Sequence, residues 1–295
     1  MDERSPDSHV TPSLLRVGAQ AIVIAVVVLM CFSTTLVLFG AWYNEWSGLN
    51  AQMSVSDGIC SVAVVPIVGD IVPFASAPAS SAEGEPLLQT SADAFVQNVR
   101  RALGDPYIKG ILVRIDSGGG WPIASKVMAD ALRDAPVPVV ALIRDIGTSG
   151  AYLAATGADV IVAEPSSDVG AIGVTMSYLD ETKKNEKEGL SFVGLASGLY
   201  KDAGHPSKPL TDEERALFER DLQVAHDDFV SAVAANRNMD PEAIAAVADG
   251  ASMPGIIALE KGLIDGLGNE AVALQWIADS LEIPLEEVTT CFPLY

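Results

Sequence analysis

A buried strand that leads through a glycine-flanked serine into a helix constrains this chain more than any other stretch. Val137–Ile143 is apolar and rich in β-branched residues, which is typical of a parallel strand buried on both faces. Gly147 and Thr148 predict a tight turn, and the small residues Gly150–Ala155 favour a helix. Ser149 would then stand at a helix N-terminus, where free N–H groups and the helix dipole favour negative charge. Ser149 is therefore a candidate nucleophile, with an ordinary helix cap as the alternative.

The same alternation of strand and helix recurs on both sides of this serine. Ile108–Ile115 is a second buried strand, and Pro122–Arg133 predicts a helix with proline in its first turn, where the missing N–H costs nothing. Asp159–Ala163 is a third strand candidate. Repeated strand–helix–strand units predict an α/β fold built on a parallel sheet with right-handed crossovers.

Three consecutive glycines separate the second strand from its helix, in the segment Asp116–Gly120. Such a segment lets the backbone approach a ligand closely and present its N–H groups. A phosphate loop is one interpretation, but neither GxxxxGK[ST] nor GxGxxG occurs. A loop that holds an oxyanion fits at least as well.

The remaining segments predict further elements around this sheet. Ile59–Val65 is a strand that continues through Val72, and residues 73–90 read as an exposed loop. Ser91 caps a helix that reaches about Leu103.

A long helix dominates the C-terminal third. A charged helix, Leu179–Glu188, leads to Leu190–Leu195, which continues the alternation, and Thr211–Glu214 is a capping box that opens the long helix. Its apolar stripe is expected to be core: Leu217, Phe218, Leu222, Ala225, Phe229 and Val233. Three shorter helices are expected after it: Pro241–Val247, Pro254–Lys261 and Glu270–Leu281.

A membrane anchor is predicted near the N-terminus. Val17–Trp42 contains no charged residue and exceeds the ~20 residues that a spanning helix needs. Arg4 and Arg16 precede it, and no Lys or Arg follows until Arg100, which places the N-terminus in the cytoplasm. A cleaved signal peptide is the alternative, but the apolar run is longer than a typical signal core.

Charge and metal-binding residue types exclude several functions. The net charge of −21 leaves no basic surface for a general nucleic-acid binder. The three histidines, His9, His205 and His226, form no HExxH motif, and no CxxC occurs, so neither a metal site nor a cofactor is expected. Cys60 and Cys291 would form a disulfide in an oxidising compartment or stay free, and the sequence does not decide between these states.

Five motifs in the right order resemble the signal peptide peptidase A family, the Ser–Lys membrane peptidases of the S49 type on the ClpP/crotonase fold. The resemblance runs from about Val62 to Leu281. The matching segments are Asp116–Gly120, Gly147–Tyr152, Gly170–Val174, Gly198–Asp202 and Asp249–Gly268.

The resemblance implies a serine endopeptidase with Ser149 as nucleophile and Lys201 as general base. The N–H groups of Gly120 and Gly150 would hold the oxyanion, and Lys201 would protonate the leaving amine before water hydrolyses the acyl-enzyme. A lysine serves as base only if its surroundings favour the neutral amine, so we expect the carboxylate of Asp202 to face away from Lys201. A Ser–His triad with His205 or His226 is the weaker alternative, because neither has an evident buried acidic partner.

The chain departs from the family pattern at two places. Ala171 stands where family members commonly carry a serine that helps to orient the base, so Ser167, Thr175 or a water would have to replace it. In the glycine loop, Gly118 replaces a proline, and Trp121 follows the glycines, where it would narrow a substrate groove or contact a neighbour.

The resemblance also implies an assembly and a location. A short form of the family would be a homo-oligomer, by resemblance an octamer, with Ser149 and Lys201 of each site coming from adjacent subunits. The lipid bilayer would hold the anchor, the catalytic domain would be extracytoplasmic, and the substrates would be remnant signal peptides or other unfolded membrane-associated peptides. The implied domains are a cytoplasmic tail (1–16), the anchor (17–42), a juxtamembrane segment (43–58), the peptidase domain (59–282) and a C-terminal tail (283–295).

Three alternatives remain open from the sequence. Ala171 motivates a catalytically impaired membrane scaffold on the same fold. Two oxyanion-binding N–H groups would also suit a crotonase-type acyl-CoA enzyme. A chain with a net charge of −21 would, however, repel coenzyme A, which is itself a polyanion. A stomatin-operon type of membrane protease would share Ser149 and Lys201, but the lack of further apolar spans after Trp42 argues against it.

Overall fold

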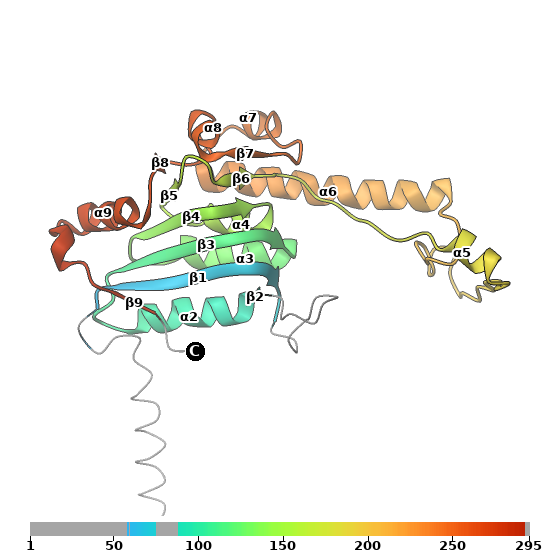
Figure 1. Cartoon of the computed structure of the whole chain (residues 1–295), viewed down its shortest axis with the longest axis horizontal. Helices are drawn as coiled ribbons and strands as arrows, with labels where there is room; N and C mark the ends of the chain where they lie inside the picture. The colour runs from blue at the N-terminus through green and yellow to red at the C-terminus, as the bar shows by residue number, and fades with distance from the viewer. Residues whose placement is uncertain (1–57, 59, 75–87, 293–295) are drawn as a thin grey trace, which may run out of the picture. The chain divides into compact units, whose positions relative to one another are not determined.

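The computed structural model describes residues 58, 60–74 and 88–292 (Figure 1). The predicted anchor, Val17–Trp42, and most of the predicted loop at residues 73–90 lie outside them. Within the described ranges, no helix combines the length and the apolar character that crossing a bilayer requires.

A nine-stranded, mostly parallel sheet carries the fold, as the sequence predicts. Its main path runs in the order β2-β1-β3-β4-β5-β8, and alternate side chains of the central strands enter the cores on its two faces. The strands of this path are β1 (Val62–Val72), β2 (Gln89–Ser91), β3 (Gly110–Gly120), β4 (Val139–Thr148), β5 (Val160–Ala163) and β8 (Gly266–Leu267).

Helices cover the two faces of the sheet unequally. The larger core lies between one face and six helices, whereas the other face packs mainly against α9 (Figure 1). Four of the six are α2 (Ala92–Gly104), α3 (Pro122–Arg133), α4 (Gly150–Ala155) and the C-terminal part of α6 (Asp212–Arg237). The short helices α7 (Pro241–Ala245) and α8 (Gly255–Glu260) each add one buried residue to the same core, and α9 spans Glu270–Leu281.

One segment predicted as a loop and one predicted as a turn are strand. The three glycines complete β3, because Gly119 and Gly120 pair with Asp70 and Ile71 of β1 across a register shift. Gly147 and Thr148 likewise complete β4 and pair with β6 (Asp168–Gly170). The prediction was wrong because neighbouring strands supply hydrogen bonds that sequence propensity does not include.

Beside this parallel sheet, β6 also pairs antiparallel with β7 (Ser252–Pro254). The N–H of Ser149 donates to the carbonyl of Gly170 at 2.7 Å. The end of β6 therefore fixes the position of the candidate nucleophile.

Residues 176–210, called the arm below, leave the sheet and pack at the N-terminal end of α6 (Figure 1). The predicted helix there is shorter, α5 (Thr182–Lys187), and Leu190–Leu195 is exposed and forms no strand. The stripe of α6 was predicted as core, yet only Phe229 and Val233 of it are buried. The first half of α6 lies beyond the sheet, so its apolar side chains have no core to enter.

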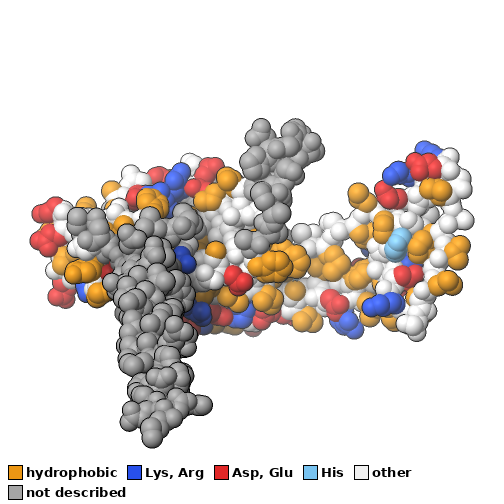
Figure 2. Space-filling model, turned by 90° about the horizontal axis from the view of Figure 1, so that it is seen from below, with side chains coloured by type: hydrophobic (Ala, Val, Ile, Leu, Met, Phe, Trp, Pro, Cys, Tyr) orange, Lys and Arg blue, Asp and Glu red, His pale blue; other side chains and the backbone are white. Residues whose placement is uncertain are grey.

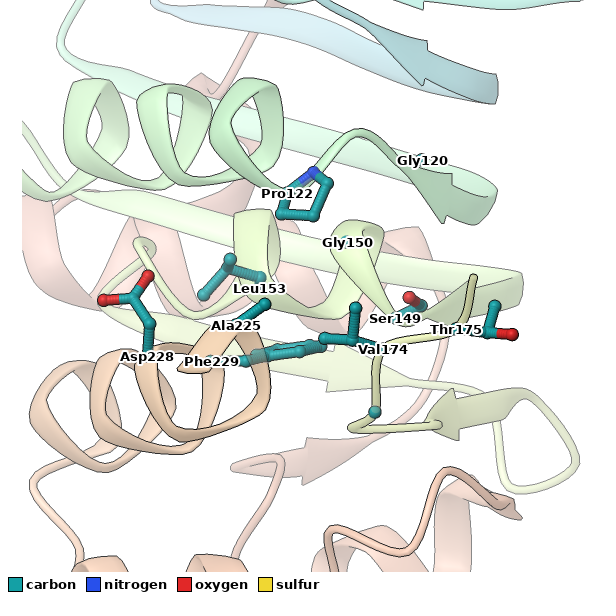
Figure 3. Close-up of a pocket in the computed structure, with 11 residues that line it drawn as sticks. Gly120, Pro122, Ser149, Gly150, Leu153, Val174, Thr175, Ala225, Asp228 and Phe229 are labelled. Atoms are coloured by element: carbon teal, nitrogen blue, oxygen red, sulfur yellow. The ribbon is translucent and has the colours of Figure 1, made fainter. Parts of the chain in front are cut away.

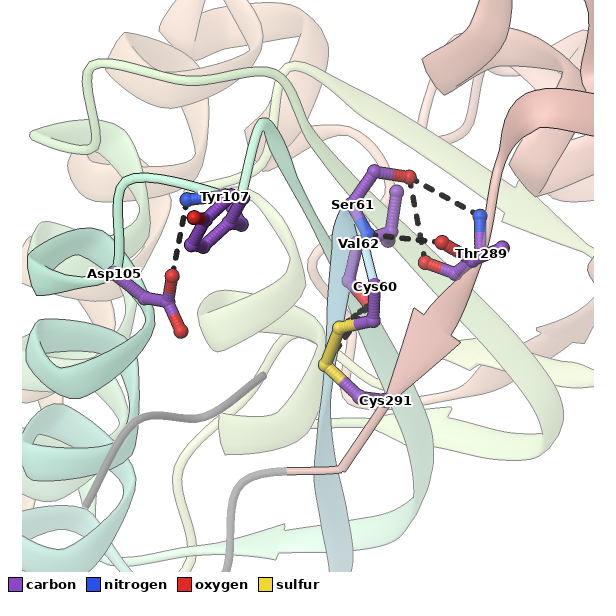
Figure 4. The surroundings of a disulfide bond; sticks show 7 residues. All are labelled: Cys60, Ser61, Val62, Asp105, Tyr107, Thr289 and Cys291. Atoms are coloured by element: carbon purple, nitrogen blue, oxygen red, sulfur yellow. Dashed lines mark hydrogen bonds between the residues drawn. A yellow bond between two sulfur atoms is a disulfide. The ribbon is translucent and has the colours of Figure 1, made fainter. Parts of the chain in front are cut away.

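The C-terminal segment returns to the start of the domain. The short helix η1 (Leu285–Glu287) leads to β9 (Thr290–Cys291), which pairs with β1. A disulfide joins Cys60 to Cys291 across a Cα–Cα distance of 5.8 Å, beside hydrogen bonds between Ser61 and Thr289 (Figure 4). Thr290 and Cys291, which were predicted to belong to a C-terminal tail, thus form a strand of the sheet beside β1.

Candidate active site

Ser149 has a backbone conformation that few residues other than glycine adopt. Its φ and ψ are 53° and −125°, between the end of β4 and the first residue of α4. Positive φ in a side-chain-bearing residue is strained and recurs at functional sites. The Ser149 hydroxyl makes no capping hydrogen bond to α4, so the interpretation as an ordinary helix cap is wrong. The Ser149 hydroxyl is therefore not occupied by a capping hydrogen bond to α4.

Buried hydrogen bonds hold this strained turn. Leu153 N–H donates to the carbonyl of Ser149 at 3.0 Å, and the fully buried Tyr152 hydroxyl donates to the carbonyl of Leu263 at 2.8 Å. Burial raises the pKa of Tyr152 well above its ordinary value, so the hydroxyl keeps the proton that it donates. The helix behind Ser149 is therefore anchored to a different part of the chain.

Two hydroxyl groups shape the glycine segment opposite Ser149. The buried Ser117 hydroxyl donates to the carbonyl of Gly69 at 2.6 Å and accepts from Gly119 N–H at 3.1 Å. Thr148 donates to the carbonyl of Gly118 at 3.3 Å. These bonds join the end of β3 to β1 and β4, which brings the glycine backbone beside the nucleophile.

Gly119 shows how closely the two backbones approach each other. Its φ is +103°, and a Cβ added there would lie 2.6 Å from Gly150 N and 3.0 Å from the Ser149 Cβ. Only glycine allows this approach.

Ser149, Gly150 and Gly120 line one cavity of about 150 Å³ (Figure 3). The structure thus brings together the predicted nucleophile and both predicted oxyanion residues. The other lining residues come from the start of α3, from α4, from the segment after β6 and from α6: Pro122, Leu153, Gly173, Val174, Thr175, Ala225, Asp228 and Phe229.

A second, more open cavity of about 470 Å³ shares Gly120 and Pro122 with the first. Trp121 lines it together with residues of β1 and β2, and its side chain is exposed. Trp121 therefore borders a cavity, and its expected role in a substrate groove or at a neighbouring chain stays a prediction. Its indole lies beside the glycine segment and outside the nucleophile's own cavity.

Lys201 is not beside Ser149 in the same chain. It is exposed in the arm, whose neighbouring Asp202 pairs with Lys208 at 3.0 Å, and Lys208 in turn with Glu214 at 2.5 Å. Glu214 lies in the first turn of α6, and Phe229, further along the same helix, lines the Ser149 cavity. At 1.5 Å per helical residue, Glu214 and Phe229 are about 22 Å apart along α6. The Asp202 carboxylate binds Lys208, in line with the expectation that it faces away from Lys201.

The model of the family described as Peptidase family S49 matches residues 131–283, just over half of the 295 residues. The chain belongs to peptidase family S49. This confirms the resemblance drawn from the motifs.

Named relatives agree with this membership. The chain is 33% identical to a protein of Methanocaldococcus jannaschii named as a candidate protease, over 62% of this chain and 60% of that one. It is 31% identical to a candidate signal peptide peptidase SppA of Enterococcus faecium, over 61% of this chain and 53% of that one. It is 32% identical to the chloroplastic serine protease SPPA of Arabidopsis thaliana, over 69% of this chain and 30% of that one. The matches thus span at most about 60% of these relatives' length.

A solved structure supports the fold. The 1510-N membrane-bound stomatin-specific protease, in a mutant form, superposes with a TM-score of 0.50 at 14% identity, over 80% of this chain and 98% of that chain. At this identity the likeness concerns the fold alone.

The structure separates the two side chains proposed to replace the family serine at Ala171. Ser167 is buried and donates to backbone carbonyls of β4, with the Arg144 oxygen at 2.6 Å, so its hydroxyl is already used. Thr175 is exposed and lines the Ser149 cavity (Figure 3). Of the two, only Thr175 borders the site.

Neither described histidine belongs to the cavity of this S49 chain. His205 stacks on Phe192 in the arm at a ring-centroid distance of 4.3 Å. His226 forms a 2.9 Å hydrogen bond with the carbonyl of Ala248. The described part of the chain therefore contains no Ser–His pair at Ser149.

Sequence reasoning missed the residues that α6 brings to the cavity. Ala225 and Phe229 were assigned to the core, and Asp228 was assigned no role. The 3.6-residue period identified a helix face, but no sequence signal tells which other segment that face meets.

Proposed function

We propose that the protein is a membrane-anchored serine endopeptidase in which Ser149 attacks the substrate carbonyl and Lys201 of a neighbouring copy is the general base. The N–H groups of Gly120 and Gly150 stabilise the oxyanion, and the acyl-enzyme is then hydrolysed. The observation that carries the proposal is the strained, uncapped Ser149, which shares one cavity with both glycines. Family membership supports the reaction class.

The arm supports the contribution of a second copy. Lys201 is exposed in the arm, which packs at the N-terminal end of α6, whereas α6 lines the cavity of its own chain only from Ala225 onward, so a neighbouring chain is the better source of the base. Large apolar side chains of the arm also face solvent, including Leu195 at 95% and Leu199 at 81% exposure, and orange side chains gather on the arm in Figure 2. Apolar surface of this kind favours contact with another chain, and burial there would favour the neutral form of a lysine.

The proposed substrates are remnant signal peptides and other unfolded, membrane-associated peptides. The cavity at Ser149 and the more open one that shares Gly120 and Pro122 with it together offer room for an extended peptide. The uncharged segment 17–42 would anchor the chain in the cell membrane and leave the catalytic domain extracytoplasmic. There, an oxidising compartment would preserve the disulfide between Cys60 and Cys291.

Mixed oligomers give the sharpest test. Full-length protein in detergent is assayed on a signal-peptide-like fluorogenic substrate as wild type, Ser149→Ala, Lys201→Ala, and Lys183→Ala as an exposed arm lysine. Both site variants should be inactive and Lys183→Ala active. Co-assembly of Ser149→Ala with Lys201→Ala should restore part of the activity, because some sites then combine an intact serine with an intact lysine.

The outcomes separate the alternatives. Activity that survives Lys201→Ala would mean that the base is misassigned, and a loss that mixing never restores would place both residues of a site in one chain. A wild-type oligomer that neither cleaves peptides nor reacts at Ser149 with a serine-directed probe would favour the catalytically impaired scaffold that Ala171 motivates.

A further inference from the structure

The cavity at Ser149 has a charge at one end and apolar walls. Leu153, Val174, Ala225 and Phe229 line it between the nucleophile and Asp228 of α6. Figure 3 places Ser149 and Asp228 at opposite ends of this group, with the apolar side chains between them. A side chain that enters beside Ser149 would therefore pass apolar surface before it reaches a carboxylate.

Asp228 has no hydrogen-bond or ion-pair partner among the described residues, whereas several other charged residues of α6 do. Asp227 accepts a hydrogen bond from Gln223 at 2.7 Å, Arg220 pairs with Asp221 at 2.7 Å, and Arg237 pairs with Asp265 at 2.7 Å. In the described ranges no cation lines the cavity with Asp228. Its negative charge is thus available to a ligand.

We infer that Asp228 makes the enzyme prefer Lys or Arg at P1, the substrate residue whose carbonyl Ser149 attacks; this rests on the proposed function. Both side chains join an apolar stem to a cationic head, which matches apolar walls with a carboxylate beyond them. A carboxylate at P1 would instead meet Asp228 as a like charge. An apolar P1 residue would fit the walls and leave the carboxylate unpaired.

The expected preference is moderate because Asp228 is exposed. Solvent weakens ion pairs of this kind, so we expect kcat/KM to be about fivefold higher for P1 Lys than for P1 Met, which is unbranched and neutral. Added salt should reduce that ratio. A peptide with P1 Glu should be the poorest of the three.

The test compares three otherwise identical peptides, with P1 Lys, Met or Glu, on the full-length wild type, Asp228→Asn, Asp228→Lys and Asp227→Asn. The last variant is a matched control, since Asp227 is adjacent and exposed but does not line the cavity. Asp228→Asn should remove the Lys-to-Met preference and keep cleavage of P1 Met, whereas Asp227→Asn should keep the preference. Asp228→Lys should favour P1 Glu over P1 Lys.

The failures are distinguishable. A wild type that cleaves none of the peptides, or whose cleavage persists in Ser149→Ala, would overturn the proposed function and this inference with it. Ser149-dependent cleavage that favours Met over Lys would overturn the inference alone. The same holds if Asp227→Asn and Asp228→Asn change the Lys-to-Met ratio equally, because the preference would then reflect the overall charge of −21. The Lys-to-Met ratio of kcat/KM is measured on the wild type, so this part of the test does not depend on whether the variants fold.

Discussion

The segment that presents Ser149 and the arm that carries Lys201 are built in opposite ways. Around Ser149, the hydroxyl groups of Ser117 in β3, Thr148 in β4 and Tyr152 in α4 are buried and donate to backbone carbonyls of other segments. In the arm, by contrast, every residue of 190–201 is exposed.

The difference teaches that the geometry of Ser149, the proposed nucleophile, is fixed within one chain, whereas the position of Lys201, the proposed base, is not. A strained φ persists only where surrounding structure holds it, and the sheet supplies that support. The arm has no core of its own and is held to α6 by a few contacts, chiefly the Asp202–Lys208–Glu214 pairs. Its apolar side chains gain burial only against another surface.

Removing the disulfide should have the largest effect, on the stability of the sheet that holds Ser149. The Cys60→Ser/Cys291→Ser variant opens a link between positions 231 residues apart, which should lower the free energy of unfolding by about 2–5 kcal/mol. Urea unfolding followed by tryptophan fluorescence measures this. Cys31→Ser, in the uncharged segment, is the control, and a double variant that unfolds at the wild-type urea concentration would contradict the expected role.

Gly119→Ala should disturb the nucleophile's surroundings directly. The new Cβ would press on Gly150 N, so we expect kcat/KM to fall about 100-fold, the scale of losing one oxyanion donor. Gly118→Ala is the matched control, because a Cβ there meets nothing within 4 Å. Equal activities of the two variants would show that the close approach at Gly119 is not needed.

Tyr152→Phe should cost less. It leaves the buried carbonyl of Leu263 without its donor, which should destabilise the sheet unit by about 1–2 kcal/mol. Burial raises the pKa of Tyr152, so its contribution is complete below the unfolded value near pH ~10 and declines as the pH rises above that value. Wild type should therefore lose stability above pH ~10 more steeply than Tyr152→Phe, and parallel pH profiles of the two would refute this.

Lys208→Ala should have the smallest effect, confined to the arm. Its hydrogen bonds lower the pKa values of Asp202 and Glu214, so their stabilising contribution is present above the ordinary carboxyl range and is lost as the pH falls through the lowered values. Hydrogen exchange should show less protection at residues 196–210 in Lys208→Ala, and in wild type at acidic pH, with the sheet unchanged. Lys187→Ala, on the exposed helix α5, is the control. Unchanged protection in Lys208→Ala would mean that other contacts hold the arm.

Local sequence patterns predicted many of the elements. The helix Pro122–Arg133, the caps at Ser91 and Thr211, and the alternation of buried strands with helices all appear as expected, since they depend on neighbouring residues. The extra strand length at Gly119–Gly120 and Gly147–Thr148, and the exposed segment 190–195, were not predicted. The extra strand residues depend on which distant strand pairs with them, and segment 190–195 is exposed because no described strand pairs with it.

By itself the sequence determined the alternation of buried strands with helices, and hence the parallel α/β fold, because apolar periodicity depends on neighbouring residues. It also singled out Ser149 as a candidate nucleophile, while the resemblance to the family implied Gly120 and Gly150 as oxyanion donors. Tertiary structure alone decided that these three residues share a cavity, that Lys201 of the same chain stays outside it, and that Asp228 borders it. Each of these facts is a distance between segments far apart in the chain. The physical reason is that side-chain burial and strand pairing fix such distances only once the whole sheet and α6 have packed together.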